Sequence, residues 1–231
     1  MDLYKKNLNK IMIHFREFER KFATFFFGPS ERTVEYSFIL RNIPYIKGLK
    51  ILEIGCTGST LSYKLAQMGF KVVAVDLRSY PFTHRNLNFI LGDILQLDLP
   101  IKYFDVVIMV STIEHIGMGG YDDDINLDGD ILMMKKVVDS VKLNGQILLT
   151  FPINPFYKEI SFYERYYDFS RIKRLIGDLN IAIEEYYIPT RNIANYSFNW
   201  IKASKKEILD QTYLKFYPHA TACLKLIKKI N

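Results

Sequence analysis

The chain has 231 residues, and 49% of them are hydrophobic, which is enough to bury a full core in one domain with additions. No run of about 18 apolar residues exists and charges interrupt the N-terminal segment, so we expect neither a membrane span nor secretion. The net charge of +6 would suit an acidic partner, but the basic residues are scattered, so we expect a solvated basic surface and no nucleic-acid substrate.

The two cysteines carry little information about chemistry. Cys56 lies in a glycine-containing turn and Cys223 in a predicted strand, and they lack the spacing of a metal site or a redox pair. We therefore expect a reduced, cytoplasmic setting.

Residues 1–46 are predicted to form a helical extension. Apolar residues recur every three or four positions from Tyr4 to Phe25, which predicts a long amphipathic helix that ends at Gly28-Pro29. We expect this helix to pack on its own domain, and the alternatives are a membrane-surface role or a homodimer contact. A second helix is expected from Ser30, as N-cap, to Leu40.

Residues 50–61 predict a strand, a tight turn and a helix. The run from Lys50 to Ile54 is apolar and favours a strand, and Gly55 and Gly58 would let a ligand approach the backbone closely. Residues 71–76 predict a second buried strand that ends at Asp76, a carboxylate suited to the two hydroxyls of a ribose.

At these residues the sequence resembles the class I S-adenosylmethionine-dependent methyltransferases. The acidic residue of Glu53-x-Gly55-x-x-Gly58 favours a cationic amino-acid cofactor over a pyrophosphate, because a pyrophosphate needs bare N–H groups and no nearby carboxylate. The charge pattern therefore disfavours NAD and favours S-adenosylmethionine. Thr57 and Ser59 stand where the family commonly has its later glycines.

The resemblance implies further cofactor-binding residues. After a loop at residues 77–84 and a short strand at residues 88–91, Asp93 stands where the family has an acid that contacts the adenine amino group. Asp93 could also cap a short turn at Leu95, and the two roles are compatible. The predicted cofactor-binding set is Glu53, Gly55, Cys56, Thr57, Gly58, Asp76, Leu77, Asp93, Ile94 and Ser111.

A fourth strand at residues 104–110 leads into the candidate catalytic pair, Glu114 and His115. Ligands of open α/β sheets bind beyond the carboxyl ends of the strands, which is where this pair is expected. His115 could act as a general base for a hydroxyl nucleophile, with Glu114 orienting it. Equally, His115 could pack under the adenine while Glu114 caps or salt-bridges the next turn.

Residues 117–130 form a glycine-rich, acidic loop. Asp124-x-Asn126-x-Asp128-Gly129 copies the first half of a calcium loop, but the twelfth position is Lys135 where a bidentate glutamate is needed. We assign no metal site and leave cation binding by this loop open. We interpret the loop as a substrate-side flap whose last aspartates cap a helix at residues 131–141. The resemblance covers residues 49–155 and points to an uncharacterised microbial branch of the family.

The remaining elements complete a Rossmann-like α/β fold. They are a fifth strand at 145–150, an aromatic-rich stretch at 152–169, a helix from near Asp168 to Ile176, and strands at 181–184 and 219–226. The last two match the antiparallel hairpin that closes methyltransferase sheets. We therefore expect a doubly wound, seven-stranded, mostly parallel sheet with an antiparallel last strand in a domain at residues 47–231.

The predicted function is transfer of a methyl group from S-adenosylmethionine to an oxygen or nitrogen of a small acceptor, which could contain a sugar. Holding the acceptor and the methyl group in contact would supply much of the acceleration. An RNA methyltransferase is the alternative enzyme, because the net charge is positive and aromatics accompany basic residues. The other alternative is a catalytically silent, cofactor-binding partner subunit.

Overall fold

A computed structural model describes residues 30–121, 123–160, 163–192, 197–215 and 217–228. The long amphipathic helix predicted at residues 3–26, and with it the homodimer contact, lies outside the described residues. The elements are α2 (Arg32–Asn42), β1 (Lys50–Ile54), α3 (Leu61–Gln67), β2 (Lys71–Asp76), β3 (Leu87–Leu91), β4 (Phe104–Val110), α4 (Gly129–Ser140), β5 (Val141–Ile153), β6 (Lys158–Ile160), β7 (Glu164–Tyr166), α5 (Phe169–Ile176), β8 (Asn180–Asn192), β9 (Ser197–Ala203), α6 (Lys205–Leu209), a 3-10 turn (Thr212–Lys215) and β10 (Ala220–Ile227).

The main sheet has the strand order β3-β2-β1-β4-β5-β10-β8-β9. The first five strands are parallel, and β10, β8 and β9 are each antiparallel to the strand before them. The predicted doubly wound, mostly parallel fold is therefore confirmed. The last strand in the sequence, β10, is antiparallel, as predicted. The predicted number of strands was wrong, because the described part of the main sheet has eight strands, not seven.

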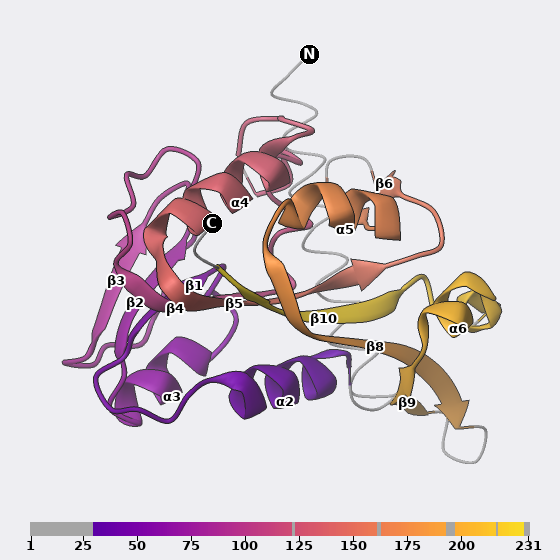
Figure 1. Cartoon of the computed structure of the whole chain (residues 1–231), viewed down its shortest axis with the longest axis horizontal. Coiled ribbons are helices and arrows are strands. Elements are labelled where there is room, and N and C mark those ends of the chain that lie inside the picture. The colour runs from indigo at the N-terminus through magenta and orange to yellow at the C-terminus, as the bar shows by residue number, and fades with distance from the viewer. Residues whose placement is uncertain (1–29, 122, 161–162, 193–196, 216, 229–231) are drawn as a thin grey trace.

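The additional strand is β9, which pairs with β8 along the outer edge of the sheet. No element was predicted for its segment, and the side chains described at residues 199–203 are exposed or half-buried, so no apolar pattern marks the strand. The hairpin of β6 and β7, which forms a separate two-stranded sheet, was also missed. Figure 1 places β9 at the end of the sheet farthest from β3.

Helices cover both faces of the sheet, as Figure 1 shows, with α2 and α3 on one face and α4 and α5 on the other. The α2 and α3 face buries Phe38, Ile39 and Leu65 against Ile51 and Val106. The larger cluster, under α4 and α5, includes Met133, Val137, Ile172 and Leu175. Strands β1 and β4 are covered by helices on both faces of the sheet. This explains why their sequences are largely apolar.

The predicted helix starts met different outcomes. Asp168 caps α5 as expected, since its Oδ1 accepts a hydrogen bond from the Arg171 backbone N–H at 2.7 Å. Helix α2 begins one residue later than predicted, with Glu31 as its N-cap, although Ser30 Oγ still accepts from the Arg32 backbone N–H at 3.4 Å. Asp128 precedes α4 but its side chain makes no cap, so that prediction was wrong.

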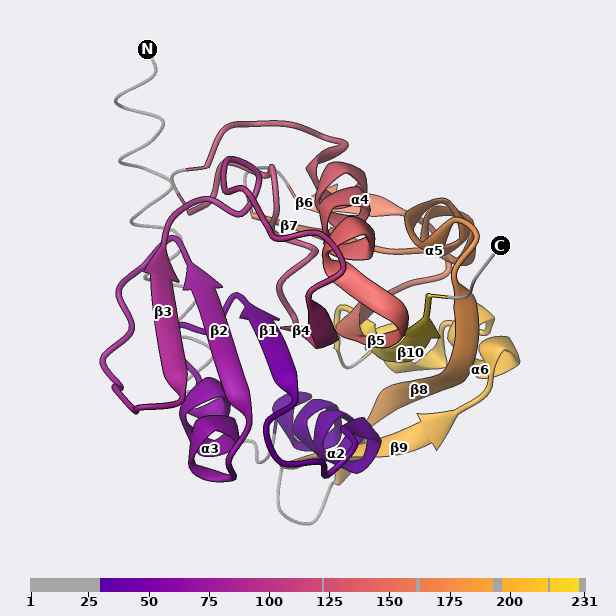
Figure 2. The same cartoon turned by 60° about the vertical axis from the view of Figure 1, so that its left-hand side comes forward.

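The carboxyl ends of β1, β2 and β3 lie next to one another at one edge of the sheet, where Figure 2 shows their arrowheads side by side. The loops that follow β1, β2 and β4 therefore meet at this edge, and the candidate site lies there. Within the described residues, none of the helices is long and apolar enough to cross a membrane.

Candidate functional site

The turn after β1 has the geometry that its glycines predict. Gly55 has φ +79°, and a Cβ on it would lie 2.3 Å from Thr112 Oγ1, so only glycine fits between the two loops. Gly58 has φ +87° and would find no atom within 4 Å of an added Cβ. The turn therefore packs against the β4 loop at Gly55 and faces open space at Gly58.

Asp76, at the end of β2, ties this turn to the second strand. Its Oδ2 accepts from the Thr57 backbone N–H at 2.7 Å, and its Oδ1 accepts from the Arg78 backbone N–H at 2.9 Å. Each carboxylate oxygen can accept a second hydrogen bond. Asp76 is thus rigidly oriented and can still receive the two hydroxyls of a ribose.

A cavity of about 420 Å³ opens between these loops. Of the predicted site residues, Glu53, Gly55, Thr57, Gly58, Asp76, Leu77, Asp93, Ile94, Ser111 and His115 line it. Cys56 and Glu114 are not brought to its wall. The Cys56 side chain is fully buried and packs with Ala74 and Tyr80, because the turn points it back under the sheet edge. Burial also raises the pKa of its thiol.

Glu53 lies at the base of the cavity with 2% of its surface exposed. The Ser62 hydroxyl donates a hydrogen bond to its Oε2. Burial, with a smaller effect from the nearby charge of Asp76, raises the pKa of Glu53 to about 7. A positively charged ligand at this point would favour the ionised carboxylate.

Asp93 makes the turn that its sequence position predicted, and it also lies at the cavity wall. Its Oδ1 accepts from the Leu95 backbone N–H at 2.8 Å, so the expected turn is present. Asp93 also lines the cavity, one loop away from Asp76. A contact with an adenine amino group stays a prediction.

Helix α2 contributes a cation that sequence reasoning missed. Arg32 lines the cavity, and its Nη1 donates to Glu35 Oε2 at 3.0 Å and to the Val110 carbonyl at 3.2 Å. Glu35 is fully buried, and its Oε1 accepts from the Ser111 hydroxyl at 2.5 Å. Ser111 has φ +42°, a backbone conformation that is held by these contacts. Helix α2 therefore fixes the end of β4.

His115 is held at the cavity wall by the β6–β7 hairpin. Its Nδ1 lies 2.7 Å from the carbonyl oxygen of Tyr163, and a carbonyl can only accept, so Nδ1 carries the proton in the neutral ring. The rings of Tyr121 and Tyr163 pack edge-on against the imidazole, each with its centroid 5.2 Å away. Nε2 is then the nitrogen that can take up a proton.

Glu114 lies beside this imidazole and behind the cavity wall. Its Oε1 is 3.9 Å from His115 Nε2, too long for a hydrogen bond but close enough for the charge of one group to bias the other. Burial raises the pKa of Glu114 well above its ordinary value, and its buried Oε2 has no hydrogen-bond partner.

Several other lining residues were missed or given only a general role. Tyr163 belongs to the aromatic-rich stretch at residues 152–169, for which no site residue was predicted, while Tyr121 and Asp123 belong to the acidic loop interpreted as a flap. Tyr36 reaches the cavity from α2, where no local pattern marks it. Among the described residues no cluster of three or more His, Cys, Asp or Glu side chains is arranged to hold a metal ion.

This arrangement defines a class of protein. The site combines a glycine turn after β1, a carboxylate at the end of β2 and an acid beneath the turn, at the carboxyl edge of an open α/β sheet. These features suit a nucleoside that carries a cationic amino acid. Glu53 suits the positive charges, Asp76 the ribose and Asp93 the adenine, while Arg32 supplies a cation for a carboxylate. The lining therefore fits S-adenosylmethionine.

Comparison with known proteins agrees with that reading. A family model described as Methyltransferase domain matches residues 52–126, from β1 into the acidic loop. The matched segment carries the glycine turn, Asp76 and Asp93, and both this match and the fold support a class I S-adenosylmethionine-dependent methyltransferase with S-adenosylmethionine as its cofactor.

Two relatives share part of the sequence. The ubiquinone biosynthesis O-methyltransferase of Rickettsia akari is 29% identical over 115 residues, which are 46% of this chain and 41% of that protein. The mitochondrial ubiquinone biosynthesis O-methyltransferase of Schizosaccharomyces pombe is 29% identical over 124 residues, 48% of this chain and 41% of that protein. The matched region thus spans less than half the length of either relative.

Solved structures share the fold at low identity. An S-adenosylmethionine-dependent methyltransferase from Archaeoglobus fulgidus has a TM-score of 0.59 at 17% identity, covering 90% of this chain and 99% of that one. Phosphoethanolamine N-methyltransferase 2 of Haemonchus contortus, solved with S-adenosyl-L-methionine, has a TM-score of 0.58 at 14% identity, covering 90% and 56%. These likenesses describe the fold.

Proposed function

We propose that the protein transfers the methyl group of S-adenosylmethionine to a hydroxyl oxygen of a small acceptor that binds beside His115. The observation that carries the proposal is the hydrogen bond between His115 Nδ1 and the Tyr163 carbonyl, at the wall of the cavity that holds the glycine turn and Asp76. A hydroxyl is a weak nucleophile until it loses its proton, so it needs a base at this place.

The residues divide into two groups in this proposal. Glu53, Asp76, Asp93 and Arg32 would hold the cofactor, as their charges fit its parts. When bound, S-adenosylmethionine supplies an electrophilic methyl group on its sulfonium. His115 Nε2 would take up the proton of the acceptor hydroxyl, so that the oxygen could accept the methyl group that the bound cofactor would supply. Glu114 lies 3.9 Å from Nε2, so the positive charge of an imidazolium would favour the ionised form of this buried carboxyl, which would in turn stabilise the imidazolium.

The choice of oxygen over nitrogen rests on two supports. A neutral amine is a good nucleophile without losing a proton, whereas a hydroxyl is a weak one until it does, so a positioned histidine adds more for a hydroxyl. The two relatives from Rickettsia akari and Schizosaccharomyces pombe are both named as O-methyltransferases. We further propose that the acceptor is a small molecule and that RNA is not the substrate.

The test is a methyl-transfer screen with small hydroxyl compounds, amines and RNA, followed by His115→Ala on the best acceptor. We expect turnover to fall roughly a hundredfold or more, the contribution typical of a general base, while calorimetry shows unchanged cofactor affinity. His84→Ala is the matched control, because His84 lies outside the cavity lining and its Nδ1 accepts from the Asn86 backbone N–H. Methylation of amines alone, or normal turnover without His115, would contradict the proposal.

A further inference from the structure

The hairpin formed by β6 and β7 is joined to the loop that carries His115. The Arg165 backbone N–H donates to the Glu114 carbonyl at 3.0 Å, which continues the hairpin into the segment after β4. The Tyr163 carbonyl receives His115 Nδ1 two residues earlier in the same hairpin. The hairpin thus contacts the backbone of Glu114, the residue before His115, and also the imidazole ring of His115 itself.

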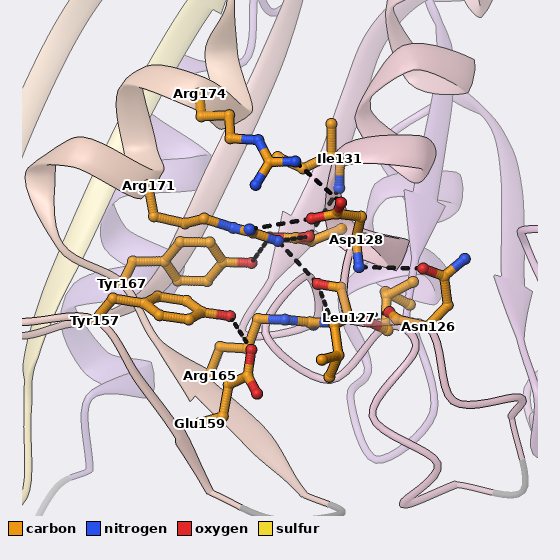
Figure 3. A network of polar contacts seen from close by, with 12 residues as sticks. Asn126, Leu127, Asp128, Ile131, Tyr157, Glu159, Arg165, Tyr167, Arg171 and Arg174 are labelled. Atoms are coloured by element: carbon orange, nitrogen blue, oxygen red, sulfur yellow. Dashed lines mark hydrogen bonds and ion pairs between the residues drawn. The ribbon is translucent and has the colours of Figure 1, made fainter.

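The side chain of Arg165 strengthens this connection. It is fully buried, and its Nη1 donates to the carbonyls of Glu114 at 3.3 Å and Ile116 at 2.7 Å. Its Nη2 donates to the carbonyls of Asn126 at 3.2 Å and Leu127 at 3.3 Å. Figure 3 shows Arg165 below Arg171, directed at the loop of Asn126 and Leu127. One guanidinium therefore joins the hairpin to two loops.

The desolvation cost of burying the Arg165 guanidinium suggests that its role is to fix the backbone around His115 and not to add stability. A buried guanidinium loses several kcal/mol of hydration, and well-packed apolar side chains in such places are often equally stabilising. The two carbonyls on Nη1 belong to residues 114 and 116, which flank His115 on both sides. The fork of the guanidinium has a rigid planar shape, so it fixes the backbone on either side of the imidazole.

We propose that Arg165 is a positioning residue for His115, which keeps the Tyr163 carbonyl on Nδ1 and so holds Nε2 as the proton acceptor. The catalytic consequence rests on the proposed function, whereas the placement of the proton on the ring does not. In water a neutral imidazole favours the proton on Nε2, so the opposite tautomer must be imposed by the protein. The titratable groups Glu114, Tyr121 and Tyr163 contact the ring, and the charge of Arg165 lies on the backbone carbonyls of residues 114 and 116.

The first experiment reads the tautomer directly by ¹⁵N NMR of His115 in the whole protein above the titration of its ring. Wild type should show the proton on Nδ1. Arg165→Met, which keeps most of the side-chain volume, should shift the population toward Nε2–H. Arg165→Lys retains a buried cation but lacks the fork, so it should lie between the two and serves as the variant where Arg165→Met does not fold.

Arg171→Met is the matched control, since Arg171 belongs to the same network in Figure 3. Arg171 Nη2 donates to the Leu127 carbonyl at 2.9 Å and pairs with Asp130 at 2.5 Å. Its guanidinium also lies over the Tyr157 ring, 5.3 Å from the centroid, and none of these contacts reaches residues 114–116. This variant should lose stability but keep the His115 tautomer. An equal tautomer change in Arg171→Met would mean that general loosening, not the Arg165 clamp, is responsible.

The second experiment measures turnover against pH in the same variants at saturating cofactor and acceptor. Arg165→Met should lower kcat by up to about a hundredfold, as expected for a misplaced catalytic group, with cofactor affinity unchanged and partial rescue in Arg165→Lys. Nε2–H in wild type, or an unchanged tautomer in a folded Arg165 variant, would overturn the proposal. A changed tautomer with full turnover would overturn the catalytic role of Arg165 and, with it, the base assigned to His115.

Discussion

Glu53→Gln should stabilise the protein in the absence of cofactor near neutral pH while weakening its binding of S-adenosylmethionine. Glu53 is 2% exposed, and its pKa of about 7 compares with an ordinary value of 4.5. That difference corresponds to about 3 kcal/mol of unfavourable free energy for the ionised, folded form. Glutamine has the same shape, can still accept from the Ser62 hydroxyl and carries no charge.

The sign follows from proton binding. Between pH 4.5 and about 7 the folded protein holds a proton on Glu53 that the unfolded chain has released, so rising pH destabilises the wild type through this window. The favourable contribution is complete below pH 4.5 and lost above about pH 7. The variant lacks this titration, so its advantage should grow from near zero to about 3 kcal/mol.

Urea unfolding of both proteins at several pH values between 4 and 8 measures this difference in the free energy of unfolding. The contributions of the other carboxylates cancel in the difference because both proteins contain them. Calorimetry between pH 5.5 and 7.5 measures the functional side. Wild-type affinity for S-adenosylmethionine should rise by up to roughly tenfold per pH unit below the pKa, and Glu53→Gln should bind more weakly with a flat profile. A stability difference independent of pH, or equal affinity in both proteins, would refute the reasoning.

Two more predictions concern the glycine turn and RNA. Gly55→Ala should abolish cofactor binding, because the added Cβ would lie 2.3 Å from Thr112 Oγ1. In Gly58→Ala the added Cβ meets no neighbour, so this variant should lose only about 1–2 kcal/mol of stability from its positive φ. Equal effects of the two substitutions in thermal unfolding and cofactor titration would count against the packing argument. RNA binding measured at increasing salt should be weak throughout, and tight binding with the steep salt dependence of counterion release would favour the RNA alternative.

The parallel half of the fold could be predicted because its strands carry strong local signals. Residues 50–54 and 104–110 are apolar except at Lys50, Glu53 and Asp105, as strands covered on both faces should largely be, and β1 ends in a glycine turn that only a close approach explains. The antiparallel edge was harder. Strands β6 and β7 have only three residues each, too few for a pattern, and none of the side chains described at residues 199–203 of β9 is buried.

The site was predictable where chain position and chemistry coincide. Asp76 and Asp93 follow the ends of β2 and β3, which must meet at one edge of a parallel sheet. Arg32 and Tyr163 could not be found this way, because their places depend on how α2 and the β6–β7 hairpin dock on that edge. The aspartates before α4 illustrate the same limit, since Asp128 pairs with Arg171 and Arg174 of α5 instead of capping its own helix.

The most direct test of the account is a calorimetric titration with S-adenosylmethionine, S-adenosylhomocysteine and NAD. We predict that both sulfur nucleosides bind and NAD does not. Asp76→Ala should weaken the binding by about 1–3 kcal/mol, because two ribose hydroxyls lose their acceptor, while the exposed Asp98→Ala should have no effect. Binding of NAD, or wild-type affinity for S-adenosylmethionine in Asp76→Ala, would contradict the central claim.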